Sequence, residues 1–404
     1  MAAVLWRYPG RCPGPRDIWA KMKIGRMNGL VWKGGIMRDE DLMLAAKLQH
    51  HLAAGLVQGA PIALPIITAT TFHVPDHTKG GYSYARAASP TWDAVEAQLS
   101  MLEEAPVVSF PSGMAAISAA LMATLQAGKR VILPSDGYYV TRVFSEQFLA
   151  PFGVEVQMIP TTAFDTADFS GAGVIYIETP SNPGLDVCDI ADVARRAHAA
   201  GALVIADNTT MTPLLQRPLD LGVDLVVAAD TKAPAGHSDV LFGHVAGRDA
   251  AMMARIRDWR RLSGAVPGSF EAWLVHRGIE TLEVRLSRMC ASAQVIAERL
   301  LAHPAVLAVR YPGLVGDPSH KVALRQMTGF GFLISFTLAD GVVAEKFLAD
   351  CTMMVQATSF GSTHTSGERR ARWGDAVPEG LIRLSVGVEP LEPLWAAIAA
   401  ALPG

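Results

Sequence analysis

The feature that most constrains the fold is an alternation of short apolar runs and helical stretches between Val107 and Gly247. The segments between the apolar runs have helical spacing, and each of them ends with a glycine. Near-continuous apolar runs are typical of strands buried on both faces, and strands that alternate with helices predict a mainly parallel sheet in an α/β domain. The expected strands are RVILP, VEVQMIP, GVIYIETP, ALVIADN and DLVVAA.

The pattern changes after residues 271–304, a stretch that predicts one long helix. Three later segments, AVLAVRYP, GFLISFTL and GLIRLSVGVE, predict strands of a smaller α+β domain, and the last apolar segment predicts a helix that closes it. A length of 404 residues also exceeds what one hydrophobic core usually organises. Two domains are therefore expected.

Composition and charge argue against several classes of protein. The formal net charge is −3 and no basic stripe is present, so we expect no nucleic-acid partner. No apolar run reaches the roughly 18 residues that span a membrane, so no membrane partner is expected. Four scattered cysteines without CxxC spacing indicate neither a disulfide framework nor a metal site, and they favour a reducing, cytoplasmic compartment.

Polar residues that follow buried strands are the first candidates for a site, because open parallel sheets bind ligands at the carboxyl ends of their strands. Lys232 follows DLVVAA, and an apolar setting would favour the neutral amine that a Schiff-base lysine needs. Asp207 ends ALVIADN, where it could pair with the protonated nitrogen of a pyridine cofactor. Taken singly, an exposed loop lysine and a loop-capping aspartate are the more common explanations of the two positions.

Three other positions fit the same kind of pocket. Ser112 and Gly113 stand at a helix start, which is either an anion site or an ordinary N-cap. Tyr138 follows RVILP and could stack on an aromatic ligand or pack at an edge. Arg383 lies in an apolar strand and needs either a structural carboxylate or a substrate carboxylate. In combination, these residues describe a pyridoxal-phosphate pocket.

From about Gly55 to the C-terminus, the chain resembles the Cys/Met-metabolism family of pyridoxal-phosphate enzymes, which includes cystathionine γ-lyases, β-lyases, γ-synthases and methionine γ-lyases. The resemblance implies fold type I, with a mainly parallel seven-stranded sheet in the large domain and a smaller α+β C-terminal domain. It is carried by PIITATTF, YSYARAASPTWDAVEAQLSMLE, SGMAAISAAL, ETPSNP, ADNTTMTPLLQRPLDLGVDLVV, DTKAPAGHSDVLFG, EAWLVHRGIETL, YPGL, GFGFLISF and LIRLSVGVE.

The resemblance also implies roles for individual residues. Lys232 would form the internal aldimine with pyridoxal 5'-phosphate and move protons, Asp207 would bind the pyridine nitrogen, and Tyr138 would stack on the ring. The other implied roles are phosphate binding by Gly113, Met114 and Thr231; cofactor contacts by Glu178, Asn182 and Thr209; and substrate binding by Arg383, Ser359 and Asn182. Tyr84 and Arg86 would reach the phosphate of a neighbouring subunit, and Tyr84 would also assist proton transfer.

Sharing of a site between subunits implies a catalytic dimer, with dimers paired into a homotetramer. The expected division of the chain is an N-terminal extension without order at residues 1–45, an arm that contacts the neighbouring subunit at 46–85, the cofactor-binding large domain at 86–285 and the C-terminal α+β domain at 286–404. Met22, Met27 and Met37 are alternative start sites, which would shorten the extension.

Departures from the family pattern bear on the substrate. Ala229 replaces a usual phosphate-binding serine, Val140 stands where methionine γ-lyases carry cysteine, and Thr358 replaces a frequent acidic residue. The resemblance implies a carbon–sulfur lyase acting on a sulfur amino acid, with cystathionine γ-lyase as the first expectation. Cystathionine β-lyase is second and γ-replacement third, and a non-catalytic pyridoxal-binding protein is the alternative from another class.

Overall fold

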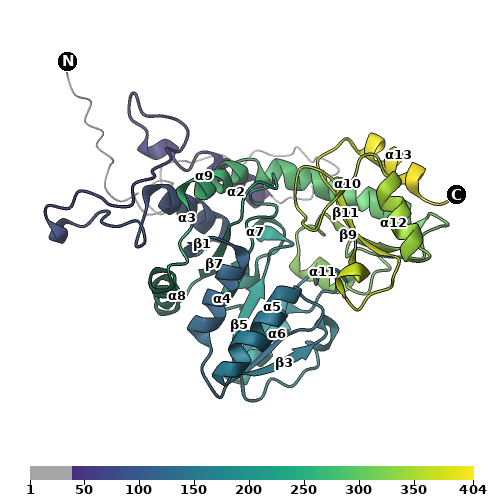
Figure 1. The fold of residues 1–404 in the computed structure, drawn as a ribbon, viewed down its shortest axis with the longest axis horizontal. Coiled ribbons are helices and arrows are strands. Elements are labelled where there is room, and N and C mark those ends of the chain that lie inside the picture. Colours follow the sequence, from purple (N-terminus) through teal and green to yellow (C-terminus); the bar gives the residue numbers. More distant parts are fainter. Residues whose placement is uncertain (1–38) are drawn as a thin grey trace.

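A computed structural model of the protein describes residues 39–404 (Figure 1). Most of the extension expected at residues 1–45 lies outside the described residues. Helix α2 (Asp39–Gln49) crosses the boundary proposed between residues 45 and 46. Residues 50–89 then form a long segment that projects to one side of the molecule, drawn purple in Figure 1.

The large sheet has seven strands in the order β1-β7-β6-β5-β4-β2-β3. Strands β2 to β6 pair in parallel, whereas β7 is antiparallel to both of its neighbours. The mainly parallel sheet and all five expected strands are confirmed. The bounds are β1 (Val107–Phe110), β2 (Arg130–Pro134), β3 (Glu155–Ile159), β4 (Ala172–Glu178), β5 (Leu203–Asp207), β6 (Leu225–Ala228) and β7 (Gly243–Gly247).

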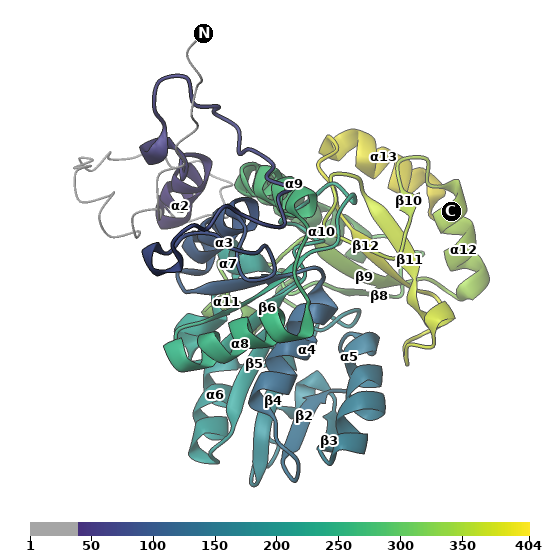
Figure 2. The same ribbon diagram turned by 60° about the vertical axis from the view of Figure 1, so that its left-hand side comes forward.

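Helices cover both faces of this sheet (Figures 1 and 2). Side chains of β2, β4 and β5 alternate between two apolar clusters, which explains their near-continuous apolar sequence. Helices α4 (Gly113–Thr124) and α8 (Ala250–Ser263) pack in one cluster, and α3 (Pro90–Glu103), α6 (Ile190–Ala199) and α9 (Ser269–Ile279) pack in the other. Short helices α5 (Tyr139–Phe144) and α7 (Thr212–Leu215) follow strands β2 and β5.

The C-terminal part contains a second sheet of five strands in the order β10-β11-β12-β9-β8. Its apolar face packs against α10, α12 and α13 in a separate cluster. The smaller α+β domain is thus confirmed. The bounds are α10 (Leu282–Leu301), β8 (Ala308–Arg310), α11 (His320–Gln326), β9 (Leu333–Thr337), α12 (Gly341–Asp350), β10 (Val355–Gln356), β11 (Ser366–Arg369), β12 (Leu381–Ser385) and α13 (Leu391–Ala401).

The single long helix expected at residues 271–304 is instead two helices, α9 and α10, separated after Ile279. Gly278 approaches the loop after β6 so closely that a Cβ atom there would lie 2.4 Å from the carbonyl oxygen of Ala235. Arg285, in the first turn of α10, donates hydrogen bonds to the carbonyl oxygens of Ala233 and Pro234. The break therefore places a buried arginine against the loop that carries Lys232. The boundary proposed between residues 285 and 286 falls inside α10.

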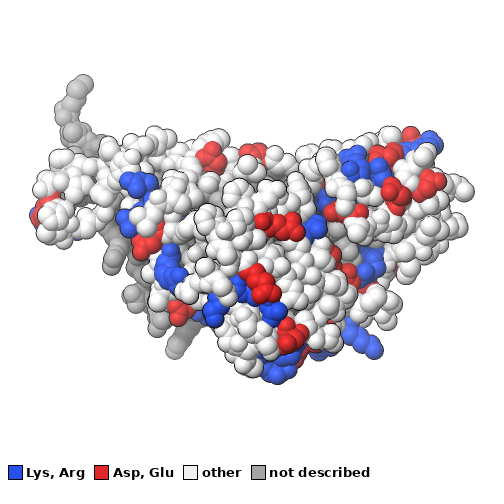
Figure 3. Space-filling view, turned by 60° about the horizontal axis from the view of Figure 1, so that its bottom comes forward, with Lys and Arg blue, Asp and Glu red and all other residues white. Residues whose placement is uncertain are grey.

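The outer surface shows no separation of charge on the side drawn in Figure 3, where acidic and basic side chains are interspersed. Within residues 39–404, no helix is both long and apolar enough to cross a membrane.

A buried charge network also fixes the loop that carries Lys232. His244 of β7 lies between two carboxylates: its Nδ1 is 2.9 Å from Asp230 Oδ2, and its Nε2 is 3.0 Å from Glu103 Oε1. All three side chains are buried. Burial alone would lower the pKa of His244, but Asp230 and Glu103 raise it to about 10. The imidazolium therefore links α3, β7 and the loop after β6.

We expect His244→Ala to lower the free energy of unfolding by about 3–5 kcal/mol, because it leaves two buried carboxylates without their cation. Urea denaturation of the purified protein measures this change. His50→Ala, at an exposed position, is the control and should unfold close to the wild type. Equal urea midpoints for the two variants would contradict the role of the network.

Candidate active site

Two carboxylates end neighbouring strands at the carboxyl edge of the large sheet. Glu178 of β4 and Asp207 of β5 are paired in register, so their side chains lie next to each other. Both are buried. Burial, together with the negative charge of Asp207, raises the pKa of Glu178 well above its ordinary value. A cationic ligand at this edge would stabilise the ionised forms of the two buried carboxylates, which otherwise repel each other.

Asp207 accepts hydrogen bonds on both of its oxygens. The hydroxyl of Tyr176 donates to Oδ2 at 3.0 Å, and the backbone amide of Thr209 donates to Oδ1 at 3.0 Å. Burial raises the pKa of Asp207, and its hydrogen bonds with Thr209 and Tyr176 oppose that rise. A carboxylate has about four acceptor positions, so Asp207 can still accept from a protonated ring nitrogen.

Tyr138 stands directly before α5, and its backbone amide donates to Glu178 Oε2 at 2.6 Å. Tyr138 is 40% exposed, so its side chain remains accessible to a ligand. Partial burial and the neighbouring Tyr139 raise the pKa of the Tyr138 phenol, which keeps it neutral. Glu178 thus positions the backbone that carries the candidate stacking ring.

Helix α4 follows β1, and its first residue lies against Ala229, directly after β6, where the sequence predicted an anion site. The first amides of a helix have no intrahelical acceptor. In α4 the hydroxyl of Ser112 accepts from the amide of Ala115, and the two amides before Ala115 remain free. A Cβ atom on Gly113 would lie 2.6 Å from that of Ala229, so glycine permits this close approach. The free amides belong to Gly113 and Met114, two of the residues expected to hold a phosphate.

The two threonines expected near the cofactor differ in what their hydroxyls do. Thr231 Oγ1 donates to the carbonyl oxygen of Phe242 at 3.2 Å and accepts from the amide of Phe242 at 3.0 Å. Thr209 Oγ1 accepts from the amide of Ala229 at 2.9 Å. The Thr231 hydroxyl would therefore have to leave a backbone partner in order to donate to a phosphate.

Lys232 lies where the two domains meet. Its Nζ donates to Ser359 Oγ at 2.8 Å and lies 5.0 Å from the ring centre of Phe360, and both of these residues belong to the C-terminal domain. Burial, and then the positive charge of Arg383, lower the pKa of Lys232 from 10.5 to about 8. A substantial fraction of the amine is thus neutral, and hence nucleophilic, at a mildly alkaline pH.

Arg383 of β12 is a buried cation that contacts the same aromatic ring. Its guanidinium carbon lies 5.3 Å from the ring centre of Phe360. Nη1 donates to Asn182 Oδ1 at 2.9 Å, and Nη2 donates to Glu368 Oε2 at 2.9 Å. Nε is buried and has no hydrogen-bond partner. A buried donor without an acceptor is costly, and a substrate carboxylate would satisfy it.

Tyr84 and Arg86 lie in the projecting segment. Tyr84 is 48% exposed, and the guanidinium of Arg86 lies 5.4 Å from its ring centre. Arg86 Nη1 donates to the carbonyl oxygen of Arg261, at the end of α8. The structure thus brings these two residues together with each other and with α8, and none of their described contacts is with Lys232 or Asp207.

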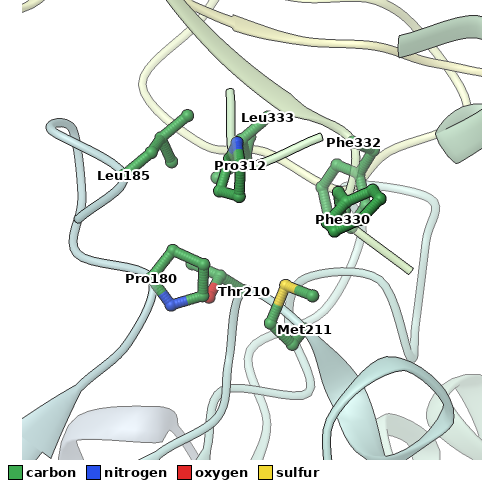
Figure 4. Close-up of a pocket in the computed structure, with 9 residues that line it drawn as sticks. Pro180, Leu185, Thr210, Met211, Pro312, Phe330, Phe332 and Leu333 are labelled. Carbon is green, nitrogen blue, oxygen red and sulfur yellow. The ribbon is translucent and has the colours of Figure 1, made fainter. Parts of the chain in front are cut away.

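A small cavity between the domains is distinct from this set of residues (Figure 4). It has room for roughly one water molecule. The large domain supplies Pro180, Leu185, Thr210 and Met211, and Figure 4 shows Pro312, Phe330, Phe332 and Leu333 on the opposite side. Its size and apolar lining do not suit a charged cofactor.

Comparison with known proteins identifies the family. The family model for Cys/Met metabolism PLP-dependent enzymes matches residues 56–403. The chain belongs to this family. Its cofactor is therefore pyridoxal phosphate, which this family attaches covalently to a lysine, and the protein is an enzyme of the carbon–sulfur lyase class.

Similar proteins of the family carry different activity names. A Streptomyces coelicolor protein with the provisional name cystathionine gamma-lyase is 49% identical over 343 residues, which cover 83% of this chain and 87% of that protein. A cystathionine beta-lyase of Bacillus subtilis is 38% identical and covers 82% of this chain and 89% of its own length.

Among solved structures, an apo methionine gamma lyase from Micromonospora echinospora aligns with a TM-score of 0.84 and 37% identity. The alignment covers 89% of this chain and 99% of that structure. The two-domain α/β architecture is thus that of fold-type-I pyridoxal-phosphate enzymes.

The residues present fit this cofactor. Buried Asp207 suits a cationic ring nitrogen, the free amides at the start of α4 suit a phosphate, and Lys232 supplies an amine of lowered pKa. When bound, pyridoxal phosphate supplies an electron-withdrawing ring. Among residues 39–404, no cluster of three or more His, Cys, Asp or Glu side chains could hold a metal ion.

Sequence reasoning missed three residues of the site: Tyr176, Phe360 and Glu368. The signal for Tyr176 was available, because it precedes Glu178 by two positions in a strand and so points to the same side of the sheet. Phe360 and Glu368 belong to segments whose positions depend on the packing of the second domain.

We expect Lys232→Ala to lose covalent attachment of the pyridoxal group. Treatment with pyridoxal phosphate, reduction with borohydride and peptide mass spectrometry would find the added mass on the Lys232 peptide of the wild type and not of the variant. Lys129→Ala, at an exposed position, should retain the modification. Attachment at another lysine of the Lys232→Ala variant, to the extent seen in the wild type, would contradict the assignment.

Proposed function

We propose that the protein is a cystathionine γ-lyase, which converts cystathionine and water to cysteine, 2-oxobutanoate and ammonia. The observation that carries the proposal is the contact of Lys232 and Arg383 with one ring, Phe360. This arrangement holds a proton-transferring amine and a carboxylate-binding cation against the same ring. The 49% identity to the Streptomyces coelicolor protein supports the choice of γ-cleavage.

The proposed roles follow from the contacts of each residue. Arg383 binds the substrate α-carboxylate through its unpartnered Nε, and Asn182 holds the guanidinium from the large domain. Lys232, in its neutral form, accepts the α-proton and returns a proton to the substrate. Ser359 Oγ positions the lysine amine at 2.8 Å.

The other cofactor-side roles are part of the same proposal. Asp207 compensates the charge of the ring nitrogen, and Tyr138 covers one face of the ring. Glu178 positions Tyr138 through its backbone amide. The remaining contacts to the cofactor are assigned to Gly113, Met114, Asn182, Thr209 and Thr231, and we infer the Thr209 hydroxyl to be a better phosphate donor than that of Thr231.

We propose further that the active unit is a dimer, with dimers paired into a homotetramer in the cytoplasm. The projecting segment exposes apolar side chains, with Val57 at 72% and Ile62 at 85% exposure. Such a surface is costly to leave in water and suits a subunit interface. In the dimer, Tyr84 and Arg86 would extend from one subunit to the phosphate site of the other.

The product of the reaction decides between the candidate activities. Supplied with cystathionine, the holoenzyme is expected to release 2-oxobutanoate, which can be identified by chromatography of the 2-oxo acids. Pyruvate instead would mean cleavage of the Cβ–S bond, which is the activity named for the Bacillus subtilis relative. Release of neither acid would overturn both assignments.

Hybrid dimers test the shared site. We expect Lys232→Ala and Arg86→Ala each to be nearly inactive alone, because one lacks the amine and the other lacks a phosphate contact. After the two variants are mixed, unfolded and refolded, hybrid dimers contain one fully native site, and cystathionine cleavage should return. Mixing that restores no activity, while wild type treated in the same way recovers, would contradict a site built from two subunits.

A further inference from the structure

Arg383 is paired with a carboxylate that lies outside the sequence motifs that carry the family resemblance. Glu368 of β11 lies directly opposite Arg383 of β12 in the antiparallel register. Its Oε2 accepts from Arg383 Nη2 at 2.9 Å. Glu368 is fully buried and Arg383 is 2% exposed, so the pair is shielded from water. An isolated charge at either position would be strongly unfavourable, and the two side chains therefore depend on each other.

Glu368 is itself held by two further donors. Arg370 Nη1 donates to its Oε2 at 2.8 Å, and the indole nitrogen of Trp373 donates to its Oε1 at 2.5 Å. Arg370 is balanced in turn by Asp375, whose Oδ2 accepts from Arg370 Nε at 2.8 Å. The residues of the short helix after β11 thus fix the Glu368 carboxylate from both of its oxygens.

These contacts determine which part of the Arg383 guanidinium faces a ligand. Asn182 occupies Nη1, while Glu368 and the backbone carbonyl oxygens of Thr358 and Ser359 occupy Nη2. The group left without a partner is Nε. Because a guanidinium is planar, fixing both Nη atoms also fixes the direction of the Nε–H bond.

We propose that Glu368 is a positioning residue, which orients Arg383 so that its free Nε–H meets the α-carboxylate of an amino-acid substrate. Glu368 also compensates the charge of Arg383 before a substrate binds. This reduces the repulsion between Arg383 and Lys232, two cations that both contact the ring of Phe360. The proposal rests on the proposed function only in that Arg383 receives an α-carboxylate. It does not depend on which carbon–sulfur bond is cleaved.

Two substitutions separate geometry from charge. Glu368→Asp keeps the negative charge but withdraws it from Arg383 by the length of one methylene group. Glu368→Gln keeps the length and one oxygen acceptor but removes the charge. Glu345→Gln is a matched control, because Glu345 pairs with Arg369 at 2.7 Å on the outer side of the same segment.

The first measurement is the binding of L-alanine to the holoenzyme by titration calorimetry. L-Alanine carries the α-amino and α-carboxylate groups but no sulfur leaving group. We expect Glu368→Asp to bind it about tenfold more weakly, as for a misdirected hydrogen bond to a charged group. Glu345→Gln should stay within about threefold of the wild type, whereas Glu368→Gln should also bind L-alanine more weakly, because its amide group meets the donors of Arg370 and Arg383 or of Trp373. Ethylamine, which lacks the carboxylate, should bind equally to all four proteins.

The second measurement is the pH dependence of pyridoxal phosphate attachment to the cofactor-free proteins. The charge of Glu368 raises the pKa of Lys232, against the larger effects of burial and Arg383. We therefore expect the midpoint of attachment to move to lower pH in Glu368→Gln and to remain unchanged in Glu368→Asp and Glu345→Gln.

The outcomes are decisive in either direction. Unchanged L-alanine binding in Glu368→Asp, or an equal loss of ethylamine binding, would overturn the positioning role. An unshifted midpoint in Glu368→Gln would overturn the charge compensation. Because L-alanine cannot undergo carbon–sulfur cleavage, a failed cystathionine assay together with the expected L-alanine result would reject the proposed substrate and leave the role of Glu368 intact.

Discussion

The buried guanidinium of Arg383 is the interaction on which the rest of the site depends. It is held from the large domain by Asn182 and from the C-terminal domain by Glu368. Burying a cation is costly unless a counter-charge and hydrogen-bond acceptors are placed around it, so these contacts favour one relative position of the two sheets. That position places Ser359 and Phe360 against Lys232. The contacts of Arg383 therefore bear both on how the two domains pack and on which residues surround the Lys232 amine.

The electrostatics of the site follow from the same arrangement. Two carboxylates, Glu178 and Asp207, end adjacent strands, and two cations lie near enough to interact with them: Lys232 lowers the pKa of Asp207, and Glu178 raises that of Arg383. Because all four are shielded from water, each one changes the pKa of its neighbours. Asp207 favours the charged form of Lys232, whereas burial and Arg383 favour the neutral form more strongly. The balance leaves an amine suited to proton transfer.

The sequence was most informative where a residue's role follows from local chemistry. Strands β2, β4, β5 and β6 could be predicted because burial on both faces requires nearly continuous apolar residues. Asp207 stood out because it ends β5, and Lys232 because it lies in the loop directly after β6. Strand β7 escaped prediction because it contains glycines and a buried histidine, whose partners Asp230 and Glu103 come from distant segments. The break between α9 and α10 and the Glu368–Arg383 pair likewise depend on contacts that form only when the chain folds.

The pKa of Lys232 tests most directly whether the Arg383 junction controls the chemistry of the amine. It can be measured in the cofactor-free protein from the rate of pyridoxal phosphate attachment as a function of pH, since only the neutral amine reacts. The structure predicts that this rate rises with pH to half of its maximum at about 8. A midpoint near 10.5, the ordinary value for lysine, would show that neither burial nor Arg383 acts on the amine and would contradict the arrangement described for the site.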